Sequence, residues 1–236
     1  MKISEKFNLG VSQAELDFVD IDTNFDSLLF LDPYFLANRN DRMSLQMSRT
    51  IRSFFSKLIE LLRTDRLKEA KALFSNLSEP NETCLGMSKG KPSGRGPGGT
   101  DADKMFQSLL KSKAVQTGIV EDIEDCHIFV DNFAKDKLSD MATNITRLHL
   151  IEYTQNQCNL WGIPLVNAPT GFYWNPRIDS WDSIYSNMLI IDRMKILLVP
   201  KGIVSYSDCY IPEKYHRHYV LNFLKNEHLK LVLCHN

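Results

Sequence analysis

The residues best suited to chemistry lie in the segment DNFAKDKLSDMATNITR, residues 131–147, which contains three aspartates and one arginine. Asp140, Asn144 and Arg147 recur at i, i+4 and i+7, so a helix would carry all three on one face. Mg²⁺ prefers oxygen ligands and is often held by one or two carboxylates together with a substrate phosphate. The segment therefore predicts a Mg²⁺ site made by Asp131, Asp136 and Asp140, at which the ion activates water for phosphodiester cleavage. Arg147 would stabilise the negative charge that develops in this reaction.

Residues elsewhere in the chain are candidates to complete this site. Glu79 is predicted as a metal ligand, and Glu82 as a further candidate, because both stand just before a glycine-rich stretch at the end of a predicted helix. Lys201, in the strand-like run LLVPK, would orient the attacking water. The acidic residues have a second interpretation of equal weight, in which they cover a solvated helix face. In that case Asp140 stands near a helix start because the macrodipole favours a carboxylate there.

The glycine-rich stretch is GMSKGKPSGRGPGG, residues 86–99, and it holds six of the eleven glycines in the chain. It misses the P-loop pattern because Pro92 stands where Ser or Thr is required. Backbone N–H groups freed by glycine, together with cations, can still follow a phosphate backbone, while a flexible basic linker is an equally weighted alternative. The predicted nucleic-acid contacts are Lys89, Lys91 and Arg95 in this stretch and Arg217 in the basic, aromatic run KYHRHYV.

These residues resemble, in part, the PD-(D/E)XK nuclease superfamily, whose members combine a helix Glu, a strand Asp and a strand (D/E)-x-Lys. Glu79 or Glu82 matches the first position, Asp131 the second and Lys201 the last. Val199 occupies the acidic position before the lysine, so the resemblance implies that another ligand comes from Asp136, Asp140 or Asp192. The runs GMSKGKPSGRG and DKLSDMATNITR also resemble uncharacterised proteins of bacterial antiphage-defence and restriction-type loci.

Composition limits the classes of partner. Lys and Arg total 28 against 29 Asp and Glu, so any attraction to nucleic acid must come from local clusters of charge. The five cysteines are odd in number and widely spaced, which argues against a disulfide framework and a zinc ribbon. No apolar run approaches the ~20 residues that span a bilayer. We expect a cytoplasmic protein with no membrane partner, with nucleic acid as a possible ligand and other protein subunits as partners. The alternative function is a non-catalytic subunit or adaptor of a defence or nucleic-acid-processing complex.

The pattern of expected helices and strands around these residues predicts an α+β fold. Its N-terminal half is helical, and the remainder contains a mixed or antiparallel sheet. Helical spacing indicates a long amphipathic helix over residues 44–74, broken near Thr64, and a second long helix over 139–161. Residues 18–32 are predicted to add one or two strands, and NMLIID with KILLVPKGIVSY to form a hairpin. The aromatic run GFYWNPRIDSW is typical of a core or interface plug. We divide the chain into regions 1–85 and 101–236, joined by the basic loop 86–100 and expected to form one compact unit.

Overall fold

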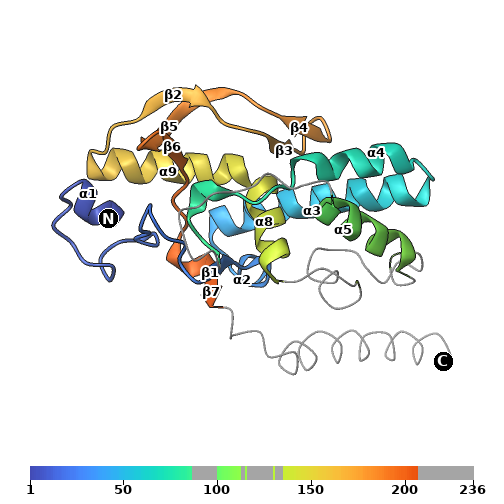
Figure 1. Cartoon of the computed structure of the whole chain (residues 1–236), viewed down its shortest axis with the longest axis horizontal. Helices are drawn as coiled ribbons and strands as arrows, with labels where there is room; N and C mark the ends of the chain where they lie inside the picture. The colour runs from blue at the N-terminus through green and yellow to red at the C-terminus, as the bar shows by residue number, and fades with distance from the viewer. Residues whose placement is uncertain (87–99, 113–114, 116–129, 131–134, 207–236) are drawn as a thin grey trace.

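The computed structural model describes residues 1–86, 100–112, 115, 130 and 135–206, and Figure 1 shows how its elements are arranged. The helices are α1 (Ile3–Lys6), α2 (Pro33–Ala37), α3 (Arg42–Arg63), α4 (Leu67–Ala72), α5 (Thr100–Lys111), α8 (Lys135–Ile145) and α9 (Arg147–Trp161), with 3-10 turns η1 (Leu73–Asn76), η2 (Asn81–Thr83) and η3 (Lys201–Ile203). The strands are β1 (Leu29–Leu31), β2 (Val166–Pro169), β3 (Tyr173–Asn175), β4 (Ser180–Asp182), β5 (Tyr185–Ile191), β6 (Met194–Ile196) and β7 (Val204–Tyr206). The predicted α+β fold, with a helical N-terminal half, is confirmed.

α3 is the long amphipathic helix that the sequence predicts. The Asp41 carboxylate caps its N-terminus by accepting a hydrogen bond of 2.9 Å from the Ser44 backbone N–H. Apolar side chains at helical spacing form its buried side: Met47, Ile51, Phe54, Phe55, Leu58 and Leu61. After the helix, Asp65 adopts φ of 57°, the left-handed conformation that commonly ends a helix. The predicted break before α4 is therefore confirmed.

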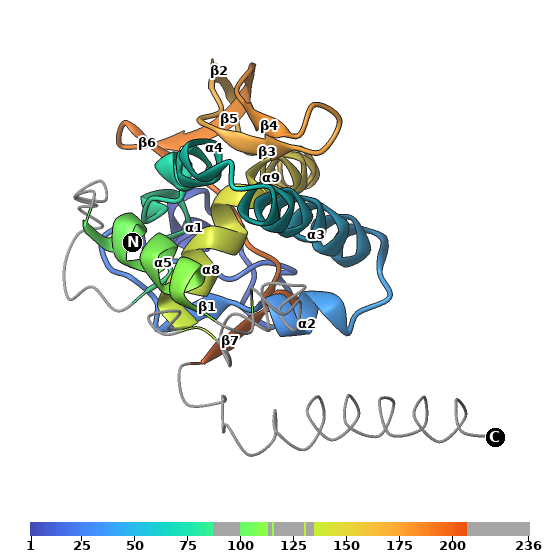
Figure 2. The ribbon, with the colours of Figure 1, turned by 90° about the vertical axis from the view of Figure 1, so that its right-hand side faces the viewer.

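The described strands pair only in antiparallel fashion and form three small sheets, ordered β1-β7, β2-β5-β6 and β3-β4. β5 and β6 form a hairpin where one was predicted, but only Met194–Ile196 of the second arm pairs with β5, and the end of that arm, β7, pairs with β1. The two turn residues of the hairpin, Asp192 and Arg193, have φ of 49° and 70°, as a type I′ turn requires. Residues 18–32 do contribute a strand, β1, but it pairs with β7 away from the larger sheet. Figure 2 shows the β2–β5–β6 sheet beside α9, with β1 and β7 on the opposite side of the molecule.

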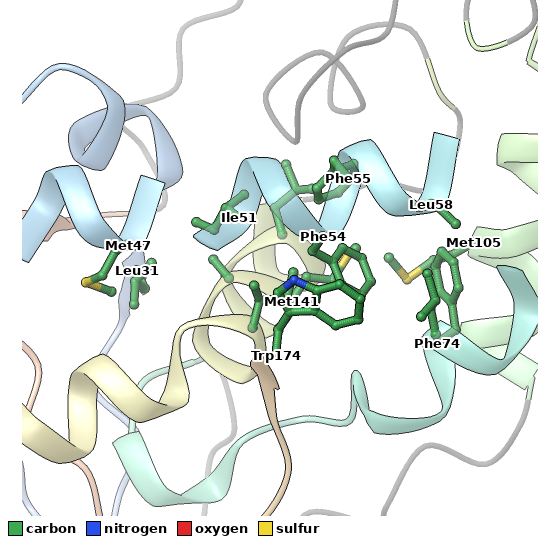
Figure 3. Close-up of a cluster of buried hydrophobic side chains, with 14 of the residues drawn as sticks. Leu31, Met47, Ile51, Phe54, Phe55, Leu58, Phe74, Met105, Met141 and Trp174 are labelled. Atoms are coloured by element: carbon green, nitrogen blue, oxygen red, sulfur yellow. The ribbon is translucent and has the colours of Figure 1, made fainter. Parts of the chain in front are cut away.

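The aromatic run between residues 171 and 181 supplies the centre of the main core. Trp174 is 1% exposed and meets the Phe54 ring edge to face, with centroids 5.2 Å apart (Figure 3). Its indole N–H donates to Ser53 Oγ at 3.1 Å, and the Trp181 indole N–H donates to the Leu73 carbonyl at 2.9 Å. Both tryptophans are therefore satisfied inside the protein. The run is predicted to be a plug in the core or at an interface, and its two tryptophans fit the core.

Two structural details differ from the sequence predictions. Residues 139–161 do not form one helix, because α8 ends at Ile145 and α9 begins at Arg147. The Thr146 hydroxyl between them donates to the Ala142 carbonyl at 2.6 Å, a local bond that competes with regular helix geometry. Lys201 was predicted on a strand but lies in η3. Pro200 has no backbone N–H for a ladder, and the chain turns there, with Ile203 donating to the Pro200 carbonyl at 3.2 Å.

Candidate functional site

α8 presents two different faces, and the candidate site lies on its polar one. The apolar face carries Leu138, Met141 and Ile145 into the core. The polar face carries Asp136 in the first turn, Asp140 in the middle and Asn144 near the end. Asp140 is half-buried and lies well inside the helix, which begins at Lys135. The interpretation of Asp140 as a residue favoured at a helix start is therefore wrong, since the macrodipole acts mainly on the first turn.

Asn144 is the link between α8 and its neighbours. The side chain is 1% exposed, and its amide nitrogen donates to the Asp140 carbonyl at 2.9 Å and to the Ser78 carbonyl at 2.5 Å. Its amide oxygen accepts from Arg147 Nη2 at 2.8 Å. Arg147 is the first residue of α9, so Asn144 holds together the chain before η2, the end of α8 and the start of α9. The predicted contact between the Asn144 and Arg147 side chains is found, although they lie on two helices, whereas Asp140 joins them through its backbone carbonyl.

Arg147 forms a buried ion pair with Glu82 of η2. Arg147 Nη1 donates to Glu82 Oε1 at 2.7 Å, and the two side chains are 6% and 18% exposed. Burial alone would raise the pKa of Glu82, but the charge of Arg147 and its hydrogen bond outweigh burial and lower that pKa, with a smaller contribution from Lys195. The backbone of η2 is anchored because the Leu197 N–H donates to the Glu82 carbonyl at 2.7 Å. Glu82 is thus a counter-ion to Arg147 in this structure.

Asp140 lies in an acidic environment. Its burial and the negative charges of Glu79, Asp136 and Asp26 raise the pKa of its carboxyl to about 8. The four carboxyl groups come from three separate stretches of the chain: the one before β1, the one before η2, and α8. Near neutral pH, Asp140 is therefore held largely protonated, and a cation placed among these carboxyls would favour its ionised form.

Of the remaining predicted site residues, the two that the structure describes, Lys201 and Asp192, lie elsewhere. Lys201 Nζ donates to the backbone carbonyls of Ala14 at 2.9 Å and Gln13 at 3.3 Å. Asp192, the other candidate ligand, pairs with Lys6 at the exposed β5–β6 turn. Asp131, Lys89, Lys91, Arg95 and Arg217 lie outside the described residues.

Within the described parts of the chain, no three His, Cys, Asp or Glu side chains are arranged as a ready metal site. Those parts also contain no helix that is long and apolar enough to cross a membrane. Among the described residues, the charges of Glu79, Asp136 and Asp26 thus act on Asp140, but no three of these carboxyls meet around one point as metal ligands would.

Sequence reasoning missed the partners that surround Arg147 and Asp140. Asp26 and Ser78 carry no spacing signal, because both reach the site through the tertiary fold. Lys195 also carries no sequence signal, because it is a single cation between apolar residues in the β5–β6 hairpin. The pairing of Glu82 with Arg147 joins residues 65 positions apart. One signal was available for this pair: a lone arginine next to an apolar helix face requires a counter-ion if it is buried.

The fold and the site define a small α+β protein with a buried, charged network between two helices and a 3-10 turn. Residues 8–211 match the family described as "Domain of unknown function (DUF8370)", so the chain belongs to that family. No curated protein and no solved structure gave a match to the chain.

Proposed function

We propose that this protein is a Mg²⁺-dependent phosphodiester hydrolase that acts on nucleic acid in the cytoplasm, as an effector of a bacterial defence system. One observation carries the proposal: Asn144 joins Asp140, whose carboxyl is surrounded by negative charge, to Arg147, because its side chain donates to the Asp140 backbone carbonyl and accepts from the Arg147 guanidinium. A carboxylate that holds a metal, placed beside a cation that can stabilise a phosphorane, is the minimum set that metal-assisted phosphodiester hydrolysis needs.

The roles of the residues follow from their charges. Asp140, with Asp136 one turn earlier on α8, would supply carboxylate oxygens to Mg²⁺, and the substrate phosphate and water would complete the coordination. Glu79, and Asp131 beyond the described residues, are the further candidate ligands. The ion would lower the pKa of its bound water, which attacks phosphorus as the bond to the leaving oxygen breaks. Arg147 would offset the charge that accumulates on the phosphoryl oxygens.

The raised pKa of Asp140 gives this proposal a measurable consequence. Metal ligands must be deprotonated, so Mg²⁺ binding at Asp140 should release a proton near neutral pH. Asparagine should also remove the free-energy cost of keeping the Asp140 carboxyl protonated in the metal-free protein. Asp140→Asn should therefore keep or slightly raise the melting temperature without Mg²⁺, and should abolish the increase that Mg²⁺ produces in the wild type.

The test is cleavage of plasmid, linear DNA and RNA by the purified protein with Mg²⁺, Mn²⁺ or EDTA. We expect cleavage with either metal, none with EDTA, and none with Asp140→Asn. The matched control is Asp179→Asn, which removes a carboxylate from the exposed β3–β4 turn, where φ is 47° and asparagine is tolerated. Cleavage that persists in EDTA, or in Asp140→Asn, would refute the metal role of this site.

A second candidate function, a subunit of a larger defence or nucleic-acid-processing complex, is favoured by a different observation. β2 is an edge strand by sheet order, and three of its four residues are exposed. Large apolar side chains are exposed on this sheet and on the segments that adjoin it: Leu160, Val166, Phe172, Ile184 and Tyr185. Exposed apolar area beside an open strand edge is typical of a surface that pairs with another protein.

One experiment distinguishes the hydrolase from the subunit of a complex. A subunit should be inactive alone and form a complex of defined mass with the product of a neighbouring gene. Val166→Lys together with Tyr185→Lys should then abolish the complex, while Asp140→Asn leaves it intact. Light scattering of the mixed, purified proteins measures this. Cleavage by the isolated chain would instead support the hydrolase.

A further inference from the structure

Two cations and a glycine meet next to the Glu82–Arg147 ion pair. Gly171 lies between β2 and β3, and a Cβ built on it would lie 3.5 Å from Arg147 Nη1 and 3.7 Å from Lys195 Nζ. Both distances are ordinary van der Waals contacts, so the Gly171 backbone lies close to the guanidinium and the ammonium group, and a side chain there would contact both. Gly171 and Lys195 are partly exposed, whereas Arg147 is 5% exposed. A ligand can therefore approach from the side of Lys195 and Gly171, with Arg147 beneath.

The hydrogen-bonding capacity of the two cations is only partly used. Nη1 and Nη2 of Arg147 donate to Glu82 and Asn144, but the buried Nε has no hydrogen-bond partner among the described residues. A buried guanidinium N–H without an acceptor costs free energy, and an additional oxygen ligand would recover it. Lys195 Nζ donates to the Pro169 carbonyl at 3.3 Å, a long hydrogen bond that leaves donors to spare within the described structure.

The charges at this place do not cancel. Arg147 and Lys195 bring two positive charges, and Glu82 is the carboxylate paired with them. Both cations lower the pKa of Glu82, which is consistent with a local field that is net positive. Such a field, partly shielded from water, attracts an anion that can accept several hydrogen bonds.

We propose that Lys195 and Arg147, where they approach Gly171, bind a phosphoryl group. A tetrahedral phosphoryl group fits because it presents oxygens to a surface ammonium and to a deeper guanidinium at the same time. The proposal rests on the proposed function for the source of that group, the polynucleotide phosphate whose charge Arg147 offsets during cleavage. Lys195 is then a binding residue for the nucleic-acid backbone.

Gly171 allows a direct test because a second glycine has the same backbone conformation without the same surroundings. Gly171 has φ of 75° and Gly162, after α9, has φ of 66°, but nothing lies within 4 Å of a Cβ placed on Gly162. Alanine at either position should cost similar strain, since both φ values are disfavoured for residues with a side chain. Only alanine at position 171 would place a methyl group in contact with the two cations.

The experiment is a titration of metal-free full-length protein with inorganic phosphate, followed by NMR of the Arg147 Nε–H signal. We expect saturable shifts of this signal for the wild type and for Gly162→Ala. Gly171→Ala should lose them, and Lys195→Met should weaken binding by about tenfold. Lys71→Met, which removes an exposed lysine from α4, is the matched charge control and should bind as the wild type does.

A second arm distinguishes the sources of the phosphoryl group. A short single-stranded oligonucleotide should compete with inorganic phosphate for wild-type protein and not for Lys195→Met, if the group belongs to a polynucleotide. If inorganic phosphate binds and the oligonucleotide does not compete with it, the site binds a small phosphate, and the polynucleotide part of the proposal is rejected. No phosphate-induced shift in the wild type, or equal shifts in Gly171→Ala and Gly162→Ala, would overturn the site itself. Metal-dependent cleavage could still stand in that case, because the titration uses neither metal nor substrate turnover.

Discussion

The two faces of α8 show how differently one helix can be held in a protein interior. On one side, Leu138, Met141 and Ile145 join a core in which Trp174 packs against Phe54 and its indole N–H has a partner. On the other side, Asn144 connects the backbone carbonyl of Asp140, a half-buried residue whose carboxyl pKa is raised, to an Arg147 whose Nε lacks an acceptor among the described residues. The apolar side is satisfied by the chain itself, whereas the polar side has excess negative charge at one end and excess positive charge at the other.

This difference separates what stabilises the fold from what is available for function. Packing optimised for stability leaves few buried polar groups without partners, and groups that remain unsatisfied call for an explanation. In the described structure one such atom, Arg147 Nε, lies at the contact of α8, α9 and η2, and the others lie further along α9 and on β7, while Trp174 and Trp181 in the core beneath α3 both have partners. The contact of α8, α9 and η2 combines an unsatisfied group with charges of both signs, so ligands can contribute there.

The largest expected effect is on the apolar side. Trp174→Ala should lower the free energy of unfolding by about 4 kcal/mol, because it leaves a cavity beside Phe54 and removes the partner of Ser53. Urea denaturation measures this. Phe172→Ala is the control two residues away, and its exposed side chain predicts a change within about 0.5 kcal/mol. Equal losses in the two variants would contradict the assignment of Trp174 to the core.

The next effect concerns the ion pair on the polar side. Glu82→Gln keeps the shape of the side chain but leaves the Arg147 charge buried without its counter-ion, so we expect a loss of about 3 kcal/mol. Arg147→Met alone should also destabilise the protein. The double variant should be more stable than the sum of the two losses predicts, by more than about 1 kcal/mol, since no charge is left unpaired. Additive losses in urea denaturation would mean that the pair does not act as a unit.

Local sequence patterns predicted the apolar side well and the polar side only in part. Helical spacing identified the buried positions of α3, because side chains at i, i+3 and i+4 share a face whatever packs against them. The same spacing placed the Asn144 and Arg147 side chains together, even though Thr146 interrupts the helix between them. Glu82, Gly171 and Lys195 were not predictable as neighbours of Arg147, because long-range packing brings η2, the β2–β3 connection and β6 to α9. The apolar run before Lys201 was read as a strand, although Pro200 turns the chain there.

The dependence of stability on pH distinguishes Asp140 from Glu82. The pKa of Asp140 is raised to about 8 in the folded protein, so between about pH 4 and about 8 the folded state keeps a proton that the unfolded state has released. Stability from this group is therefore lost as the pH rises through that window. Asp140→Asn should gain stability relative to the wild type as the pH increases from about 5 to about 8, measured by urea denaturation.

The pKa shift of Glu82 has the opposite sign to that of Asp140, so Glu82 is the control for this measurement. Its pKa is lowered in the folded protein, so its contribution is present above the unfolded pKa and is lost as the pH falls through the folded one. The difference between Glu82→Gln and the wild type should therefore be largest near neutral pH and shrink in acid. A pH-independent difference for Asp140→Asn would show that its carboxyl is not held protonated by the fold.

The smallest expected effect tests which carboxyls share the environment of Asp140. Burial is the first cause of its raised pKa, followed by the charges of Glu79, Asp136 and Asp26 in that order. Glu79→Gln should accordingly lower the pKa of Asp140 most, Asp136→Asn less and Asp26→Asn least, each by about half a unit or less because the charges are partly screened. Titration of the Asp140 carboxyl carbon by NMR measures this, with the exposed Asp103→Asn as the control that leaves the pKa unchanged. Since burial remains in every variant, none should return the pKa to its ordinary value near 3.8. If Asp26→Asn had the largest effect, the negative charge would be centred on the segment before β1, and Glu79 and Asp136 would lose their place as the ligands nearest to Asp140.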